Sequence, residues 1–162
     1  MIEIRRIKPD EGPAAKRVIY RVAHDIFHDP RSLEESIVYH ESRGELKDMD
    51  DIQRNYFEKG GIFLVMLDDN HLIGTGAIRQ LEDDICELKR LWLLSQYHGK
   101  GLGYRMLQEL FSFAREKGYK RIWLQTDAVQ QSRALEFYRR LGFHEIPRYT
   151  DRTDDIAMEM PL

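Results

Sequence analysis

The stretch that most constrains the fold is residues 91–105, in which closely spaced glycines connect an apolar segment to an amphipathic one. The apolar segment predicts a strand and the amphipathic segment predicts a helix. Gly99, Gly101 and Gly103 let the backbone approach a ligand, because glycine has no Cβ and tolerates positive φ. The first N–H groups of the helix lack partners within it and lie at the positive end of its dipole, so they favour phosphate oxygens. The sequence therefore predicts a loop that binds a phosphorylated cofactor.

Two common phosphate-binding loops do not fit this stretch. A P-loop requires Ser or Thr directly after its Gly-Lys pair, whereas Lys100 is followed by Gly101. A dinucleotide-binding fingerprint requires a third glycine three positions after a Gly-x-Gly pair. That position is Tyr104 when counted from Gly99, and Met106 when counted from Gly101. Both patterns are therefore excluded.

The sequence His98-Gly99-Lys100-Gly101-Leu102-Gly103 resembles the acyl-CoA-binding motif of the GNAT N-acetyltransferase superfamily, Arg/Gln-x-x-Gly-x-Gly/Ala. It departs from that motif where His98 replaces Arg or Gln, although histidine can still donate to a phosphate. The resemblance implies that acetyl-CoA is the acyl donor and that backbone N–H groups from Gly99 to Tyr104 carry most of the contact. The predicted cofactor-binding residues of the loop are His98, Gly99, Lys100, Gly101, Leu102, Gly103 and Tyr104. Lys100 and Arg105 are the nearest cations, and Lys100 either contacts the phosphates or is solvated.

Length and composition narrow the class of protein. The chain has 162 residues, which predicts a single domain over residues 1–162 with a core of its own. Its net charge of −3 gives no overall basic field to attract nucleic acid or an anionic membrane. Cys86 is the only cysteine, which excludes an internal disulfide and a multi-cysteine metal site. The first residues carry no signal-peptide core, so we expect a cytoplasmic protein. Since no set of metal-ligand residues stands out, we also expect no bound metal.

The periodicity predicts an α/β (α+β) chain with a mixed central sheet flanked by helices. This order matches the GNAT-type acyl-CoA N-acyltransferase fold over essentially the whole chain. Asp10 and Ser132 are predicted N-caps, and Gly118 and Gly142 are predicted helix ends. The expected strands are residues 2–7, 62–67, 72–78, 85–93, 121–126, 143–149 and 156–160. The expected helices are residues 14–26, 31–43 and 50–59, a helix after the glycine loop that contains residues 106–114 and stops at Gly118, and a helix from the Ser132 cap to Gly142.

The strand before the glycine loop changes its alternation. Apolar residues occupy even positions at Cys86 and Leu88 but odd positions at Leu91 and Leu93. Because strand side chains alternate between faces, this change predicts an extra residue, a β-bulge, across Lys89-Arg90. In GNAT proteins, a bulge here holds the pantetheine arm and polarises the thioester carbonyl. The resemblance thus places Leu91, Trp92 and Leu93 along the cofactor; alternatively, this apolar run is buried on both faces.

Two residues are predicted to be catalytic by the resemblance. Tyr138 precedes Gly142-Phe143 on a predicted helix, as does the tyrosine that acts as general acid near the CoA sulfur in GNAT enzymes. Its alternative role is that of a core tyrosine with its hydroxyl at the surface. Glu87 stands where some GNAT enzymes have a general base, and its alternative role is that of a solvent-facing strand carboxylate. Gln131 either contacts the pantetheine arm or only begins the helix.

Two further patterns have simpler explanations than a site. His24 and His28 have the spacing of a helical metal pair, but no third ligand accompanies them, which favours an exposed helix end. Asp48, Asp50 and Asp51 form an acidic turn that we expect to be solvated.

The sequence therefore predicts an N-acetyltransferase that transfers the acetyl group of acetyl-CoA to a primary amine by direct attack in a ternary complex. The alternative is a non-catalytic CoA-binding module on the same fold. The amine belongs either to a small molecule or to a protein, and the resemblance places it near residues 25–59 and 147–156. A homodimer is consistent with the resemblance.

Overall fold

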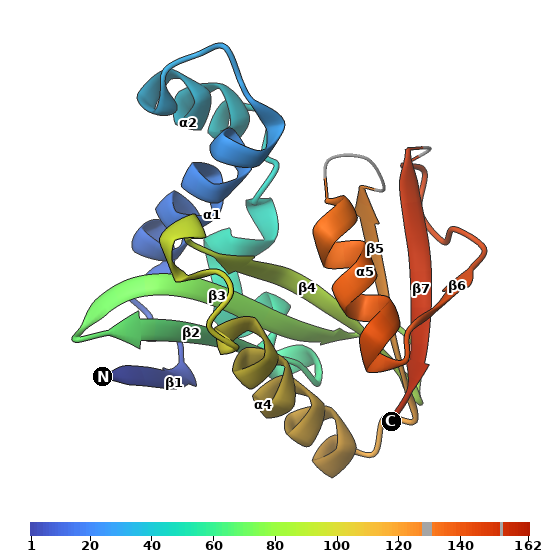
Figure 1. Ribbon diagram of the computed structural model, residues 1–162. Coiled ribbons are helices and arrows are strands. Elements are labelled where there is room, and N and C mark those ends of the chain that lie inside the picture. Colours follow the sequence, from blue (N-terminus) through green and yellow to red (C-terminus); the bar gives the residue numbers. More distant parts are fainter. Residues whose placement is uncertain (128–130, 153) are drawn as a thin grey trace.

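The computed structural model describes residues 1–127, 131–152 and 154–162. Within these ranges, seven strands form one sheet in the order β1-β2-β3-β4-β5-β7-β6 (Figure 1). Neighbouring strands are antiparallel except for β4 and β5, which are parallel. The strands are β1 (Ile2–Arg6), β2 (Ile62–Asp68), β3 (His71–Gln80), β4 (Ile85–Leu93), β5 (Arg121–Asp127), β6 (His144–Ile146) and β7 (Asp155–Pro161). The mixed sheet with flanking helices confirms the predicted fold class.

Helices cover both faces of the sheet (Figure 1). Phe63 and Val65 of β2 pack in one core with α1, whereas Leu64 and Met66 pack in a second core with α4 and α5. This strand is therefore buried on both faces. The helices are α1 (Gly12–Phe27), α2 (Leu33–Ser42), α3 (Ile52–Asn55), α4 (Leu102–Lys117) and α5 (Ser132–Leu141), and the 3₁₀ turns are η1 (Lys47–Asp51), η2 (Phe57–Lys59) and η3 (Ser95–Tyr97).

The parallel strands β4 and β5 separate soon after they begin. They pair only from Ile85–Glu87 on β4 to residues 121–123 on β5. Beyond that point β4 continues to Leu93 and β5 to Asp127, each paired only with its outer neighbour. The sheet thus opens between these two strands, with α5 beside the opening (Figure 1).

The predicted bulge in β4 is confirmed. Ala77 of β3 pairs with Lys89 and Thr75 pairs with Trp92, so two steps along β3 correspond to three along β4. Arg90 has a φ of 55°, in the left-handed region that non-glycine residues rarely adopt. The Thr75 hydroxyl donates to the carbonyl oxygen of Arg90 over 2.6 Å, which fixes the bulge from β3.

A second contact fixes the bulge from the opposite side. Arg90 donates to both carboxylate oxygens of Asp48, through Nη2 at 2.6 Å and Nε at 3.1 Å. Asp48 also accepts a hydrogen bond from the Tyr56 hydroxyl. The prediction that the acidic turn is solvated is therefore wrong for Asp48, because its carboxylate binds the bulge. Asp51 caps the short helix α3 instead.

Both predicted N-caps are wrong, for a common reason. Glu11, not Asp10, occupies the N-cap position of α1. Its carboxylate makes no cap bond and instead accepts two hydrogen bonds from Arg5, each of 2.8 Å. Ser132 is the first residue of α5, and Gln131 holds its N-cap position without a side-chain bond. In each case the helix begins one residue away from the predicted start. The predicted residue therefore does not occupy the N-cap position.

The helix ends are confirmed and the segment before β2 is corrected. Gly118 and Gly142 lie in the left-handed region directly after α4 and α5, as predicted. The helix expected over residues 50–59 is broken into η1, α3 and η2. The strand expected over residues 143–149 is shorter, ending at Ile146.

Candidate functional site

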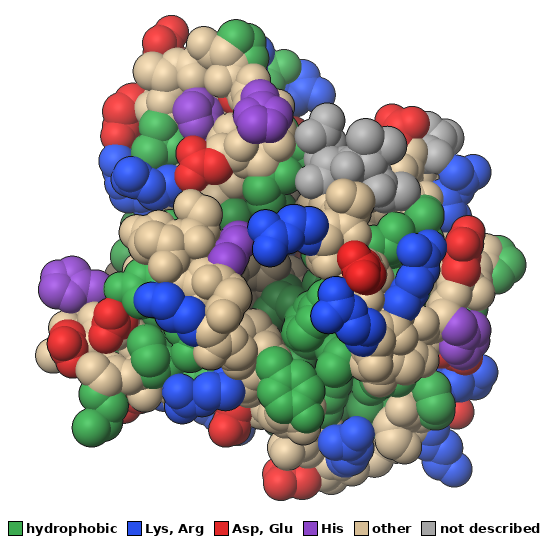
Figure 2. Space-filling model, in the orientation of Figure 1, with side chains coloured by type: hydrophobic (Ala, Val, Ile, Leu, Met, Phe, Trp, Pro, Cys, Tyr) green, Lys and Arg blue, Asp and Glu red, His purple; other side chains and the backbone are tan. Residues whose placement is uncertain are grey.

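A cleft of about 630 Å³ lies where β4 and β5 separate. The segment joining α1 and α2 forms one wall, and α5 contributes to the opposite one. Figure 2 shows a hollow in the middle of this face, with hydrophobic side chains in its depth and Lys and Arg side chains around it. The predicted site residues that line the cleft are Glu87, Leu91, Trp92, Gln131 and Tyr138.

The glycine loop presents a row of free backbone donors. Gly99 and Gly101 both have a φ of 77°, which glycine alone adopts without strain. None of the N–H groups of residues 99–104 donates to an acceptor among the described residues. A Cβ added at Gly99, Gly101 or Gly103 would meet nothing within 4 Å, so all three face open space. The loop therefore has the donors and the access that phosphate oxygens require.

The basic side chains of the loop, unlike its backbone N–H groups, contact other parts of the protein. The Nε2 atom of His98 lies 2.7 Å from the carbonyl oxygen of Leu93, so this nitrogen holds the loop against the end of β4. Only Nδ1 of His98 remains for a ligand. The Lys100 Nζ lies 5.6 Å from the centre of the Tyr97 ring, on the protein's own surface.

The other predicted cofactor-binding residues differ in how far their side chains are buried. Leu102 is buried in the core, so only its backbone is accessible to a ligand, whereas Tyr104 is exposed. Leu91 and Leu93 pack toward the core that contains α4, and Trp92 packs toward the core that contains α1. All three residues are half-buried, and Leu91 and Trp92 line the cleft.

Tyr138 lies on α5 with its ring among aromatic neighbours. The ring centroids of Phe143 and Phe137 are 5.6 and 6.0 Å away. The residue is only 7% exposed, so its ring belongs to the core, as the alternative role expected. Burial raises the pKa of the phenol, which therefore stays protonated at neutral pH. Tyr138 also lines the cleft.

Glu87 is held inside the cleft by two partners. Its Oε1 accepts from Arg79 Nε at 2.5 Å, and its Oε2 accepts from the Tyr149 hydroxyl at 2.7 Å. The residue is 5% exposed, so the alternative of a solvent-facing carboxylate is wrong. Sequence reasoning missed both partners. Arg79 lies directly opposite Glu87 in the sheet, and cross-strand pairing of opposite charges was the signal for it. Tyr149 lies 62 positions away and gave no such signal.

Comparison with known proteins identifies the family. The family model described as the acetyltransferase (GNAT) family matches residues 22–143. The chain belongs to the GNAT family. An uncharacterized N-acetyltransferase of Escherichia coli, YjgM, is 31% identical over 98% of this chain and 92% of its own length. Several vertebrate N-acetyltransferases also match, and the chain spans less than half of their length.

Solved GNAT structures have the same fold. An acetyltransferase of this family from Staphylococcus aureus superposes with a TM-score of 0.85 at 20% identity, covering 100% of this chain and 99% of that one. PaiA N-acetyltransferase from Thermoplasma acidophilum, solved in complex with coenzyme A, has a TM-score of 0.78 at 24% identity over 100% and 99% of the two chains. The protein is therefore an acetyl-CoA-dependent N-acetyltransferase with the GNAT fold.

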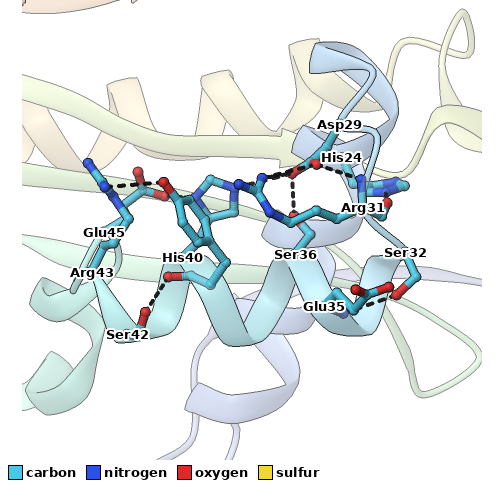
Figure 3. Close-up of polar contacts among 11 residues, drawn as sticks. His24, Asp29, Arg31, Ser32, Glu35, Ser36, His40, Ser42, Arg43 and Glu45 are labelled. Carbon is cyan, nitrogen blue, oxygen red and sulfur yellow. Dashed lines mark hydrogen bonds and ion pairs between the residues drawn. The ribbon is translucent and has the colours of Figure 1, made fainter.

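In this GNAT protein, the wall formed by the α1–α2 segment is held by a polar network (Figure 3). Asp29 accepts hydrogen bonds from the Arg31 backbone N–H at 2.9 Å and from the Ser36 hydroxyl at 2.8 Å. The Nε2 atom of His24 lies 2.7 Å from the carbonyl oxygen of Arg31. These bonds tie the end of α1 to the start of α2, and they use His24 for structure rather than for a metal.

Neither a metal cluster nor a membrane span occurs in the part of the chain that the structure describes. No three His, Cys, Asp or Glu side chains gather there as a metal site would require. None of its helices has the length and apolar character needed to cross a bilayer.

Proposed function

We propose that this enzyme acetylates a primary amine of a small-molecule or protein acceptor, by direct attack of the amine on acetyl-CoA in a ternary complex. The observation that carries the proposal is the row of free N–H groups from Gly99 to Tyr104 beside a cleft lined by Tyr138 and Glu87. The pyrophosphate of the donor would bind these N–H groups at the start of α4. The pantetheine arm would then enter the opening between β4 and β5.

Gly103 supports the assignment of the loop. It lies in the first turn of α4, outside the positive-φ region, and a Cβ there would meet nothing within 4 Å. Alanine at such a position stabilises a helix by about 0.5–1 kcal/mol relative to glycine. Neither the backbone conformation nor packing within the protein requires glycine there. Close approach of a ligand to the backbone does require it.

The reaction needs a neutral amine, a stabilised oxyanion and a protonated leaving group. The amine nitrogen forms a bond to the thioester carbon, whose oxygen becomes an oxyanion. The C–S bond then breaks and the sulfur leaves as a thiolate, while the amine loses a proton. We assign the oxyanion to backbone N–H groups at the β4 bulge, because a bulge leaves ladder groups unpaired.

Two side chains would handle the protons. Glu87 takes the proton lost by the amine, directly or through water; two lone-pair directions of the carboxylate remain after Arg79 and Tyr149 have bound it. Tyr138 supplies a proton to the thiolate, and its buried phenol is protonated over the working pH range. Because the burial of Tyr138 places it in apolar surroundings, its proton has few competing acceptors.

The test is calorimetric titration with acetyl-CoA, followed by thiol release against a panel of amines in the same sample. Binding together with thiol release on any amine would support the proposal. Binding without thiol release across the panel would favour the non-catalytic module, and absence of binding would refute the loop assignment. Gly103→Glu, which adds bulk and negative charge in open space, should abolish binding without disturbing the fold.

A further inference from the structure

We propose that the acceptor carries a carboxylate close to its amine, as an amino acid does, and that Lys89 binds this carboxylate. This inference rests on the proposed function and names the acceptor class. Lys89 lies on β4, lines the cleft and stands directly before the bulge.

Lys89 differs from the other Lys and Arg side chains of the cleft in having no carboxylate partner among the described residues. It makes neither an ion pair nor a hydrogen bond with any residue that the structure describes. Each of the other four lies within 4 Å of a carboxylate. These pairs are Arg31 with Asp29 at 3.2 Å, Arg79 with Glu87 at 2.5 Å, Arg90 with Asp48 at 2.6 Å and Arg152 with Asp155 at 3.6 Å.

The surroundings of Lys89 make this lone charge unfavourable. The residue is half-buried. Burial lowers the pKa of its amine, and the guanidinium groups of Arg90 and Arg79 lower it further, against a smaller opposite effect of Glu87 and Asp48. A partly desolvated cation is stabilised when an anion binds it. A negatively charged group of a ligand would therefore bind favourably at Lys89.

The carboxylates of the cleft indicate the same class of acceptor. Three of the carboxylates that line the cleft, those of Asp29, Glu87 and Asp155, each lie within 4 Å of an arginine of the protein. These three carboxylates are therefore paired within the protein and offer less to an acceptor with several positive charges. An acceptor with one amine and one carboxylate matches the charges that remain.

The position of Lys89 relative to Glu87 suits a small acceptor. The two residues lie two apart on β4, before the bulge, and so share one face of the strand. Their Cα atoms are separated by about 6.6 Å at the usual rise of a strand. An acceptor whose amine and carboxylate lie only a few bonds apart could therefore contact both side chains. Free amino acids have this arrangement.

The experiment compares free amino acids with their carboxamides as acceptors, at saturating acetyl-CoA. The carboxamides keep the amine and lose the negative charge. For the wild type we expect kcat/KM to be roughly 10- to 100-fold higher for the acid, mainly through KM, as for a charge-assisted hydrogen bond. Lys89→Gln should lose this preference, Lys89→Arg should keep most of it, and Lys47→Gln, on the exposed surface of η1, should retain it in full.

The outcomes separate this inference from the proposed function. Thiol release only with amines that lack a carboxylate would leave the acetyltransferase proposal standing and overturn the inference. An equal fall in kcat with acid and carboxamide in Lys89→Gln, not restored by Lys89→Arg, would also overturn it, because it would make Lys89 a base. Absence of thiol release with every acceptor would refute both.

Discussion

The bond between Asp48 and Arg90 is expected to stabilise the fold and to shape the bulge. Asp48→Asn removes the charge and keeps the volume of the side chain. It also replaces one of the two carboxylate oxygens that face the guanidinium with an NH₂ donor, and it weakens the acceptor of the Tyr56 hydroxyl. We therefore expect the variant to lose both stability and turnover.

The magnitude follows from the burial of the pair. The side chains of Arg90 and Asp48 are 19% and 25% exposed. Breaking a fully buried ion pair costs about 3–5 kcal/mol, whereas an exposed pair contributes about 0–1 kcal/mol. An intermediate value of about 2 kcal/mol is expected here, which corresponds to a fall in Tm of about 4–8 °C for a chain of this length.

Asp50 provides a matched control in the same turn. Its carboxylate pairs with Lys16 at 2.5 Å, but its side chain is 61% exposed. Asp50→Asn should therefore lower the Tm by less than about 2 °C. Thermal unfolding of the two variants gives the difference in stability, and thiol-release kinetics well below either Tm gives the effect on kcat. Equal Tm values, or an unchanged kcat in Asp48→Asn, would refute the view that this pair fixes the bulge.

Three further predictions test other parts of the structure. Gly103→Ala should raise the free energy of unfolding by about 0.5–1 kcal/mol yet weaken acetyl-CoA binding at least about tenfold, whereas Gly118→Ala, at a φ of 93°, should lose stability and keep its affinity; unchanged affinity in Gly103→Ala would contradict the loop assignment. Tyr138→Phe should lower kcat by roughly a hundredfold with little change in the calorimetric Kd for acetyl-CoA, and an unaltered kcat would remove Tyr138 from the acid role. Arg5 lowers the pKa of Glu11 to about 2, below its unfolded value, so the stability from this pair is complete above about pH 4.5 and is lost as the pH falls toward 2. Denaturant unfolding across this window should show a loss about 2–3 kcal/mol smaller in Glu11→Gln, and identical pH profiles would contradict this.

The features that the sequence predicted correctly depend on local rules. The bulge in β4 was predictable because the strand has a period of two and one extra residue reverses it. The ends of α4 and α5 were predictable because Gly118 and Gly142 take a conformation that other residues avoid. The glycine loop belongs to the same group, since its motif is continuous in the chain.

The features that escaped prediction depend on contacts between distant residues. Glu11, and not the predicted Asp10, holds the N-cap position of α1, and its carboxylate binds Arg5 from the preceding strand. Asp48 lies 42 positions from Arg90, and no periodic signal connects a turn to a bulge. The same holds for Tyr149 at Glu87. The partners of these residues can be identified only once the fold is known.

The separation of β4 and β5 gives the sheet two edges in its interior. Edge strands expose N–H and C=O groups that can pair with any extended chain. Here those groups face each other across the cleft and are shielded from other protein molecules by α5 and the α1–α2 segment. An extended amide-containing ligand would complete the ladder from within, as an added strand does at an outer edge. Those amide hydrogens of residues 124–127 that point toward the cleft, and not toward β7, should therefore exchange rapidly in the free protein and slowly once acetyl-CoA is bound.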